Sequence, residues 1–124
     1  MLIKTLYRVA RMRIFFKTKT LQKTCSEAKE AIKRLGTKRG LKLQQRMMEL
    51  QAAATLADIS RVPPARCHEL KKNRKGQLSV DLEHPYRLLF IPANEPIPYL
   101  EDGGLDWGGV TEIEIIEIVD THKE

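Results

Sequence analysis

The chain has 124 residues, of which 42% are hydrophobic and 31% are charged. This composition is typical of one compact domain and excludes an extensively disordered chain, which would contain fewer apolar residues. No apolar run approaches the roughly 20 residues that span a bilayer, so we expect no membrane association. Cys25 and Cys67 cannot by themselves form a disulfide framework or a four-ligand zinc site. Without a secretory leader, the expected location is the cytoplasm.

Charge divides the chain into two unlike halves. Residues 1–62 hold 15 Lys and Arg against 4 Asp and Glu, a net charge of +11, whereas residues 63–124 carry a net charge of −5. A basic surface raises the local concentration of polyanions, which makes nucleic acid the leading partner class. The alternative is that helices carry solvated Lys and Arg for solubility, and charge alone does not separate the two.

The first predicted elements are a strand and a helix. Residues 1–11 are basic and irregular, so we expect an N-terminal extension that precedes a single domain at residues 12–124. The run Met12–Phe16 predicts a strand. From Thr20 to Leu35 apolar residues recur every three or four positions, as on one face of an amphipathic helix, and Gly36 is expected to end that helix.

A second helix is predicted to follow at once. Thr37 can cap its N-terminus, and apolar residues again fall on one stripe until the pattern fades near Ile59. Pro63 and Pro64 then exclude a helix. Together the two helices predict a basic helical hairpin.

The pattern then changes to short β-prone runs separated by turn-forming residues, at 68–71, 77–82, 86–91 and 110–119. Hairpin connections favour a mostly antiparallel sheet. In the last run the alternation of Glu and Ile breaks at Ile116, which predicts a bulge or a strand covered on both faces. The predicted fold class is α+β, a small antiparallel sheet with two N-terminal helices packed on one face.

A long stretch rich in Pro and Gly, residues 92–109, separates the last two predicted strands and contains the single Trp of the chain, Trp107. A loop of this length in a small domain is usually functional or mobile. Trp107 has two interpretations: it stacks on a base or a partner, or it folds back over the sheet edge, and the second is the more frequent arrangement.

Common nucleotide, zinc and hydrolase motifs are absent from the sequence, and we expect neither a cofactor nor a metal. Polar residues instead gather near the predicted strand ends: Arg66, His68, Lys71, Arg74, Lys75, Arg87, Asp120 and His122. Such residues suit phosphodiester cleavage, in which a base takes a proton from a ribose 2′-hydroxyl, cations stabilise the charge on phosphorus and an acid protonates the leaving oxygen. Histidine suits the proton transfers near neutral pH, and Arg and Lys suit the phosphate.

Each candidate also has a purely structural interpretation. His68, taken alone, is more often a hydrogen-bonded residue at a sheet edge, and the run Lys71–Gly76 is equally well a turn with solvated charges. Arg87 lies inside an apolar run, an unfavourable place for a guanidinium, which makes it the best single candidate for a functional cation. Asp120 and His122 are two residues apart, so an extended chain places them on the same side.

Four segments in chain order resemble the RelE/ParE superfamily, and within it the HigB family, the killer toxins of type II toxin–antitoxin systems: ARCHEL, KKNRKGQLSVDL, HPYRLLF and EIEIIEIVDTH. The resemblance extends from about Met12 to His122 and is most specific from His68 to Phe90. It implies a small antiparallel sheet with two N-terminal helices packed against it.

The resemblance implies a ribosome-dependent endoribonuclease, an mRNA interferase that inhibits translation without a metal. His68 would be an acid/base or orienting residue, Lys71 would contact phosphate, and Arg87 would stabilise the transition state. Asp120 and His122 would complete the site as a C-terminal acid/base pair. The implied RNA-binding cations are Arg66, Lys72, Arg74 and Lys75 near the site and Lys38, Arg39 and Lys42 on the helices. The implied partners are the ribosome, messenger RNA and a cognate helix-turn-helix antitoxin of the HigA type.

One departure from the family pattern concerns the C-terminus. The typical signature is Asp-Tyr-His, whereas here Thr121 stands between Asp120 and His122. Thr121 has no ring to stack on a base, and such stacking contributes about 1–3 kcal/mol, which predicts a weakened nuclease unless another ring replaces it. The aromatic residues that could do so are Tyr86, Tyr99 and Trp107. Two alternatives therefore stay open: a non-enzymatic toxin or regulator that binds a protein target, as the gyrase-inhibiting branch of the superfamily does, and an RNA-binding module without cleavage.

Overall fold

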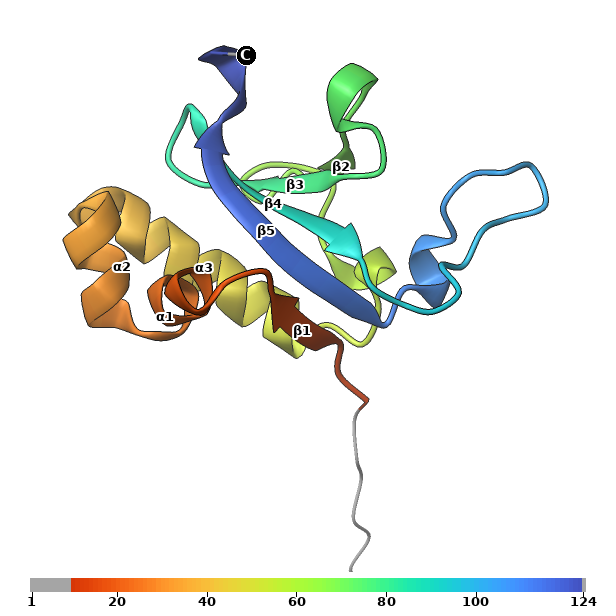
Figure 1. The fold of residues 1–124 in the computed structure, drawn as a ribbon, viewed down its shortest axis with the longest axis horizontal. Helices are drawn as coiled ribbons and strands as arrows, with labels where there is room; N and C mark the ends of the chain where they lie inside the picture. The colour runs from red at the N-terminus through yellow and green to blue at the C-terminus, as the bar shows by residue number, and fades with distance from the viewer. Residues whose placement is uncertain (1–9, 124) are drawn as a thin grey trace, which may run out of the picture.

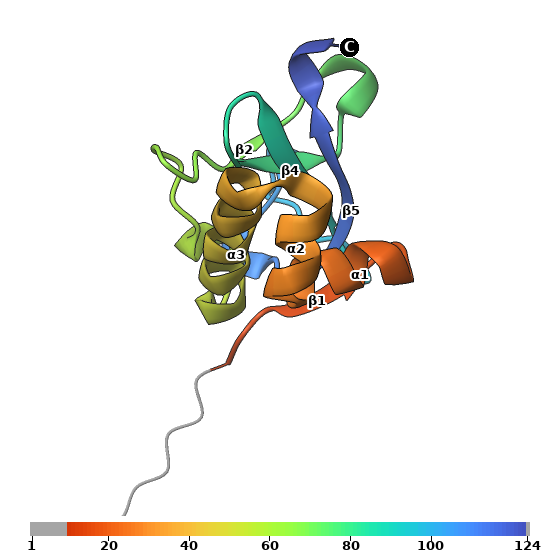
Figure 2. The same ribbon diagram turned by 90° about the vertical axis from the view of Figure 1, so that its left-hand side faces the viewer.

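The computed structural model describes residues 10–123, and residues 1–9 of the expected N-terminal extension lie outside them. Within the described part, five strands form one sheet in the order β1-β5-β4-β3-β2, and three α-helices lie on one side of it (Figure 1, Figure 2). The strands are β1 (Arg13–Phe16), β2 (His68–Glu69), β3 (Leu78–Asp81), β4 (Tyr86–Pro92) and β5 (Glu112–Asp120). The helices are α1 (Lys19–Ser26), α2 (Ala28–Leu35) and α3 (Thr37–Ala52). This arrangement confirms the α+β class.

The sheet is mixed, so the prediction of an antiparallel sheet is only partly correct. Strands β2 to β5 pair antiparallel with their neighbours, but β1 lies parallel to β5, with Ile14 opposite Ile113. Apolar alternation predicts which face a residue occupies, but it carries no information on the direction of a neighbour that is distant in sequence. β1 therefore forms one edge of the sheet, and the helices follow directly after it.

The helical region contains three helices among the described residues, whereas the sequence predicts two. The chain leaves the helical conformation at Glu27, where φ is −118° and ψ is 117°, and this residue separates α1 from α2. Because Cys25 and Ala31 on either side are both buried, the apolar pattern runs across the interruption and hides it. Gly36 ends α2 as predicted, with φ of 85°, but Thr37 is the first residue of α3 and not its cap.

Gly40 lets α2 and α3 pack closely. A Cβ atom at this position would lie 2.9 Å from the backbone nitrogen of Ile32 and 3.0 Å from the carbonyl carbon of Ala31. The neighbouring atoms belong to the backbone, which cannot rotate away as a flexible side chain does. Glycine is therefore the residue that fits where the two helices meet.

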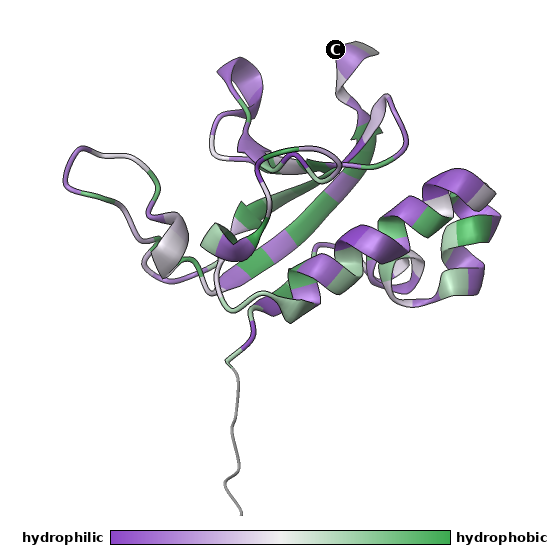
Figure 3. Ribbon diagram, turned by 180° about the vertical axis from the view of Figure 1, so that it is seen from behind, coloured by the Kyte–Doolittle hydropathy of each residue, from purple (hydrophilic) through white to green (hydrophobic). Residues whose placement is uncertain are grey.

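The hydrophobic core lies between the helices and one face of the sheet. Leu43 of α3 and Leu88 of β4 are fully buried there, together with further side chains of the sheet: Leu78, Val80, Phe90, Ile113 and Ile115. Successive strand residues point to opposite faces, so a residue that alternates with these, such as Arg87, points away from the helices. Figure 3 shows the alternation of apolar and polar residues along the strands. We call the face without helices in the described chain the open face.

β5 contains one residue more than the paired part of β4. Leu89 pairs with Glu117 and Phe90 pairs with Ile115, so Ile116 has no partner in the register. This finding confirms the bulge predicted from the break in alternation. Residues three positions apart in a regular strand lie on opposite faces, but the bulge brings both Glu114 and Glu117 to the open face.

The connection between β4 and β5, residues 93–111, projects from the sheet (Figure 1) and returns to it at Trp107. Trp107 is 8% exposed and donates a hydrogen bond from Nε1 to Glu69 Oε2 at 3.2 Å. The guanidinium of Arg61 lies over its ring, 3.7 Å from the centroid. These contacts confirm the interpretation of Trp107 as a residue that covers the sheet edge at β2. A ring held in this way is not free to stack on a base.

α3 is the longest described helix, with 16 residues, and it ends at Ala52 rather than near Ile59. A 3₁₀ turn at Leu56–Asp58 follows. Residues 10–123 include no helix long and apolar enough to cross a membrane. The same residues include no group of three or more His, Cys, Asp or Glu side chains that could hold a metal ion.

Candidate functional site

Strand pairing brings His68 and Arg87 to the open face. His68 lies opposite Ser79 of β3, and Arg87 lies opposite Asp81 of the same strand. Directly paired residues share a face, and Ser79 and Asp81 alternate with the core residue Val80. Two residues that the sequence singles out therefore lie on neighbouring rows of the sheet, away from the helices.

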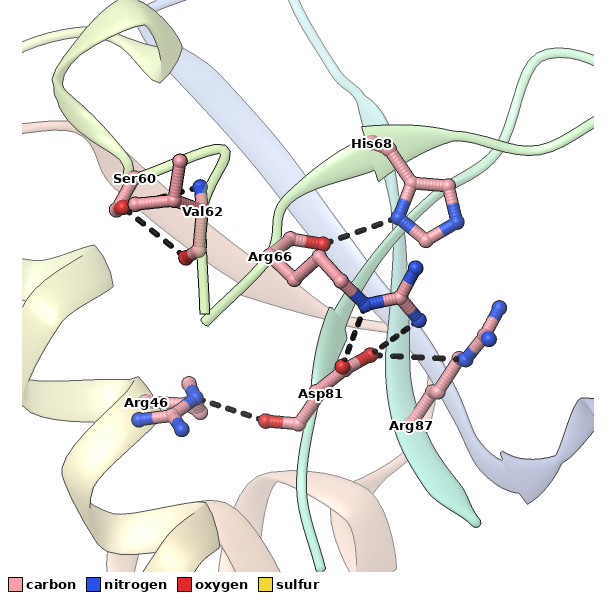
Figure 4. Close-up of polar contacts among 7 residues, drawn as sticks. All are labelled: Arg46, Ser60, Val62, Arg66, His68, Asp81 and Arg87. Atoms are coloured by element: carbon pink, nitrogen blue, oxygen red, sulfur yellow. Dashed lines mark hydrogen bonds and ion pairs between the residues drawn. The ribbon is translucent and has the colours of Figure 1, made fainter. Parts of the chain in front are cut away.

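Asp81 lies between two arginines, and we call Arg66, Asp81 and Arg87 the Asp81 cluster (Figure 4). The carboxylate accepts hydrogen bonds from Arg66 Nε at 2.8 Å and from Arg66 Nη2 at 3.1 Å, and it forms an ion pair with Arg87 Nε at 3.6 Å. These hydrogen bonds raise the pKa of the Arg66 guanidinium. The side chains of Arg66 and Asp81 are 39% and 27% exposed, so solvent screens their attraction and its contribution to stability is small. With two cations and one carboxylate, the cluster retains a positive charge and suits an anionic ligand.

The backbone of Arg66 orients the imidazole of His68. Arg66 has a φ of 47°, a left-handed conformation that is uncommon outside glycine and is concentrated at functional positions. Its carbonyl oxygen lies 3.0 Å from His68 Nδ1. Because a carbonyl can only accept, Nδ1 donates the hydrogen bond, and Nε2 holds the lone pair when the ring is neutral. Nε2 is then the atom that can take a proton from a substrate.

A third arginine holds the backbone of Asp81 from the helical side. Arg46 of α3 is 2% exposed, and its Nε donates to the carbonyl oxygen of Asp81 at 2.7 Å. Its Nη1 lies 3.3 Å from a carboxylate oxygen of Glu49. The end of β3 is therefore fixed through its backbone, independently of the contacts that the Asp81 side chain makes.

A second row of residues crosses the open face beside the cluster: His68, Ser79, Leu89 and Glu117. Arg74 donates from Nη1 to Glu117 at 3.2 Å and to the side chain of Gln77 at 3.0 Å. Ser79 and Leu89 are fully buried, and Ser79 Oγ has no hydrogen-bond partner among the described residues. Arg74, which the sequence predicts as an RNA-binding cation, is thus engaged in an ion pair within the chain.

The turn between β2 and β3 carries three predicted phosphate- or RNA-binding lysines. The 3₁₀ turn Lys72–Arg74 stands above the sheet on its open side (Figure 1), and Lys72 is left-handed with φ of 56°. Lys71, Lys72 and Lys75 are all exposed. They add positive charge at the edge of the open face.

Asp120 and His122 form a separate C-terminal group with His84. Asp120 is 7% exposed and lies opposite Tyr86, which packs against the core, so its side chain points to the helical face. Its Oδ1 accepts from the backbone nitrogen of His122 at 2.9 Å and lies 3.6 Å from His122 Nδ1. The chain turns here, in a 3₁₀ turn at Thr121–Lys123, and is not extended as the sequence suggests. The His122 ring packs edge to face on His84, with 5.2 Å between centroids.

The C-terminal group and the Asp81 cluster occupy one corner of the sheet, on its two faces. Arg87 pairs with Val119, which directly precedes Asp120. Within residues 10–123 no hydrogen bond or ion pair joins the two groups. The fold therefore brings His68 and Arg87 together but leaves the predicted C-terminal acid/base pair apart from them.

The predicted RNA-binding residues of the helices lie in the helical layer. Arg39 stacks on Tyr86, with Cζ 3.6 Å from the ring centroid, and pairs with Glu83 at 3.7 Å. Lys38 and Lys42 are exposed and line a hollow of about 630 Å³ together with Glu83. Arg39 is thus held within the chain, whereas the two lysines are open to a partner.

Sequence reasoning missed Asp81, Arg46 and Ser79. A signal for Asp81 was available, because a hairpin centred on His84 pairs residue 81 with residue 87. Arg46 carried no such signal, since an arginine in a basic helix is ordinarily solvated and its burial follows from packing alone.

Comparison with solved structures shows that the fold recurs in a chain of one other complex. A chain of the YoeB-YefM complex from Staphylococcus aureus matches with 15% sequence identity and a TM-score of 0.50, over 88% of this chain and 95% of that chain. The YoeB dimer from Staphylococcus aureus matches with 17% identity and a TM-score of 0.47, over 87% of this chain and 94% of that chain. No protein-family model matches the sequence, and no curated protein matches it either. At this level of identity the likeness establishes the fold and not the activity.

Proposed function

We propose that the chain is the toxin of a type II toxin–antitoxin system, of the HigB type within the RelE/ParE superfamily, and that it cleaves messenger RNA on the ribosome. Its fold, shared with a chain of the YoeB-YefM complex, supports the superfamily. One observation carries the proposal: His68, with Nε2 free to accept a proton, and Arg87 lie on adjacent rows of the same open face.

In the proposed reaction His68 Nε2 takes the proton of a ribose 2′-hydroxyl, and the 2′-oxygen attacks the neighbouring phosphorus. The bond from phosphorus to the 5′-oxygen of the next nucleotide breaks, which leaves a 2′,3′-cyclic phosphate. Arg87 stabilises the negative charge that develops on the phosphoryl oxygens. The departing 5′-oxygen takes a proton from the solvent, because Asp120 lies on the other face of the sheet and no hydrogen bond or ion pair joins His122 to His68 or Arg87 within residues 10–123. Lys71 contacts phosphate.

The proposed partners are the ribosome, its bound message and a cognate antitoxin of the HigA helix-turn-helix type, all in the cytoplasm. The structure with the shared fold is a complex of YoeB with YefM, which supports a partner protein of some kind for this chain. The exposed lysines on both layers suit a large RNA surface, and binding to it is expected to weaken steeply with salt.

The test is controlled expression followed by mapping of the 5′ ends of messages. We expect growth arrest and new 5′ ends within translated regions. His68→Asn and Arg87→Ala are each expected to reduce cleavage by about 100-fold or more, since each removes a group acting in the transition state. Arg13→Ala is the matched control, because Arg13 also lies beside a carboxylate, 3.9 Å from Glu112, but outside the site.

Other outcomes contradict the proposal in distinct ways. Arrest with intact messages, retained in both variants, would identify a non-enzymatic toxin that binds a protein target. Harmless expression together with RNA binding would identify an RNA-binding module without cleavage. The position of the Asp120 side chain on the helical face favours this module as the second candidate.

A further inference from the structure

We propose that Arg66 and Arg87 together form a binding subsite for one phosphate of single-stranded RNA, and that Asp81 is the positioning residue that sets both guanidiniums. The ligand class rests on the proposed function. Three charged side chains share their donors and acceptors in the Asp81 cluster.

The donors that Asp81 leaves unused define the subsite. Asp81 engages Nε and Nη2 of Arg66 and Nε of Arg87. Within the described chain, Nη1 of Arg66 and both Nη atoms of Arg87 have no hydrogen-bond partner. Figure 4 shows these free ends on the side of the carboxylate that faces the His68 ring. Two guanidiniums held on one carboxylate match the several oxygens of a phosphate.

Asp81 orients the two guanidiniums and does not compete with the phosphate for their free Nη groups. Two guanidiniums this close repel each other, and the shared carboxylate offsets the repulsion while it fixes their orientation. The carboxylate contacts the Nε edges and not the free Nη ends of Arg87. Its own backbone is anchored by the buried Arg46. A donor pair fixed before the ligand arrives binds more tightly than two mobile side chains.

The subsite also adjoins the proposed base. The carbonyl of Arg66 holds His68 Nδ1, while the side chain of the same residue contributes to the subsite. A phosphate bound by the free Nη groups would therefore lie beside the imidazole that activates the 2′-hydroxyl of the adjoining ribose. Arg66 thus contributes its guanidinium to the subsite and its backbone carbonyl to the orientation of His68, the proposed base.

The experiment is a titration of the full chain with an uncleavable RNA trinucleotide carrying 2′-O-methyl groups, followed by the NMR signals of the arginine Nε–H groups. The signals of Arg66 and Arg87 are expected to shift together with one dissociation constant. Arg66→Ala is expected to weaken binding about ten-fold, as the loss of a charge-assisted hydrogen bond to phosphate does. Arg13→Ala removes an ion-paired arginine elsewhere on the open face, and it is expected to change the dissociation constant of the trinucleotide by less than about two-fold.

Whether Asp81→Asn weakens or strengthens RNA binding decides the role of the carboxylate. By charge alone, loss of an anion strengthens RNA binding, and the control Glu112→Gln is expected to do so slightly or not at all. Asp81→Asn is expected to weaken binding by about five-fold or more because the guanidiniums lose their orientation. Equal or tighter binding by this variant would show that Asp81 competes with phosphate and would overturn the positioning role.

Two further results would overturn the subsite: no shift of either arginine signal at millimolar trinucleotide, or an Arg66→Ala variant that binds as well as the parent chain. Thermal unfolding of each variant checks that it folds. Because the ligand cannot be cut, binding is measured independently of catalysis. Failure to find cleaved messages would remove the proposed function while leaving the subsite to be judged by the titration.

Discussion

Arg46 Nε donates a hydrogen bond to the backbone carbonyl of Asp81 at 2.7 Å, and so ties α3 to the strand end that carries the Asp81 cluster. The two residues are 35 positions apart in sequence. A guanidinium that is 2% exposed is costly to desolvate unless its donors are paired, and the contacts with Asp81 and Glu49 supply partners. This bond explains why a charged residue occupies a core position.

Arg46→Met is expected to lower the free energy of unfolding by about 2–4 kcal/mol, because it leaves the Asp81 carbonyl without its partner and removes the ion pair between a buried guanidinium and the partly exposed Glu49. The measurement is urea denaturation. Arg34→Met is the control, since Arg34 is half exposed and pairs with Glu30 one helical turn away. It is expected to change stability by less than about 0.5 kcal/mol. Equal effects of the two substitutions would contradict the role assigned to Arg46.

Gly40→Ala has two opposite effects on the stability of the protein. Alanine favours a helix interior over glycine by about 1 kcal/mol. The added Cβ, however, would stand 2.9 Å from the backbone of Ile32, and forcing the helices apart costs about 1–3 kcal/mol. We expect net destabilisation, seen as a lower thermal midpoint. Gly108→Ala is the control, because its Cβ would make an ordinary contact of 3.6 Å. A more stable Gly40→Ala variant would show that the helices can shift without cost.

Trp107 is the single tryptophan of the chain, so its fluorescence reports one site. Because the ring is 8% exposed, emission is expected to shift to the red on unfolding, and acrylamide is expected to quench the native protein weakly. An uncleavable RNA should leave the native emission unchanged. Strong quenching by RNA would instead assign the ring to base stacking. Trp107→Phe removes the donor to Glu69 and is expected to cost about 1 kcal/mol of stability.

The two buried thiols make stability depend on alkaline pH. Burial raises the pKa of Cys25 and of Cys67 from 9.0 to about 12. Below pH 9 both thiols are protonated in the folded and unfolded states, so they contribute no pH dependence. Between about pH 9 and 12 the unfolded thiols ionise first, so stability falls by up to about 1.4 kcal/mol per pH unit for each thiol. Denaturation of the parent and of Cys25→Ala/Cys67→Ala at pH 8 and above measures this slope, and identical slopes would contradict it.

Thr121→Tyr introduces, between Asp120 and His122, the Tyr of the Asp-Tyr-His signature of the proposed family. If the missing ring weakens the proposed nuclease, the substitution is expected to raise the rate of single-turnover cleavage on programmed ribosomes about ten-fold. Thr121→Val, which keeps the shape without a ring, is the control. An unchanged rate in the Tyr variant would show that stacking at this position does not limit cleavage.

Local signals were enough to predict several parts of the fold. The break in alternation at Ile116 predicted a bulge or a strand covered on both faces, and the structure has the bulge. Gly36 predicted the end of α2. Because Arg87 lies in an apolar strand, an unfavourable position for a guanidinium, it was predicted to be a functional cation. The fold places it on the open face, on the row next to that of His68. In each case the information lies within a few neighbouring residues, where alternation and turn preference act.

Other parts depend on contacts between distant residues and left no local trace. The parallel pairing of β1 with β5 joins the two ends of the domain, and the interruption at Glu27 falls within a continuous apolar pattern. The resemblance implied that Arg66 is an RNA-binding cation, but its bond to Asp81 depends on the pairing that brings β2 beside β3. The C-terminal pair was placed by assuming an extended chain, and the turn after Asp120 changed its direction.

The two layers of the fold separate the basic residues into sets that one short RNA strand cannot reach together. Lys38 and Lys42 belong to the helical layer, whereas Arg87 lies on the opposite side of the sheet, with the hydrophobic core between them. A single-stranded segment laid along Arg87 would have to wrap around an edge to touch α3. In the proposed function, the lysines of α3 would therefore bind a second segment of a folded RNA, on the side of the protein opposite the proposed cleavage site.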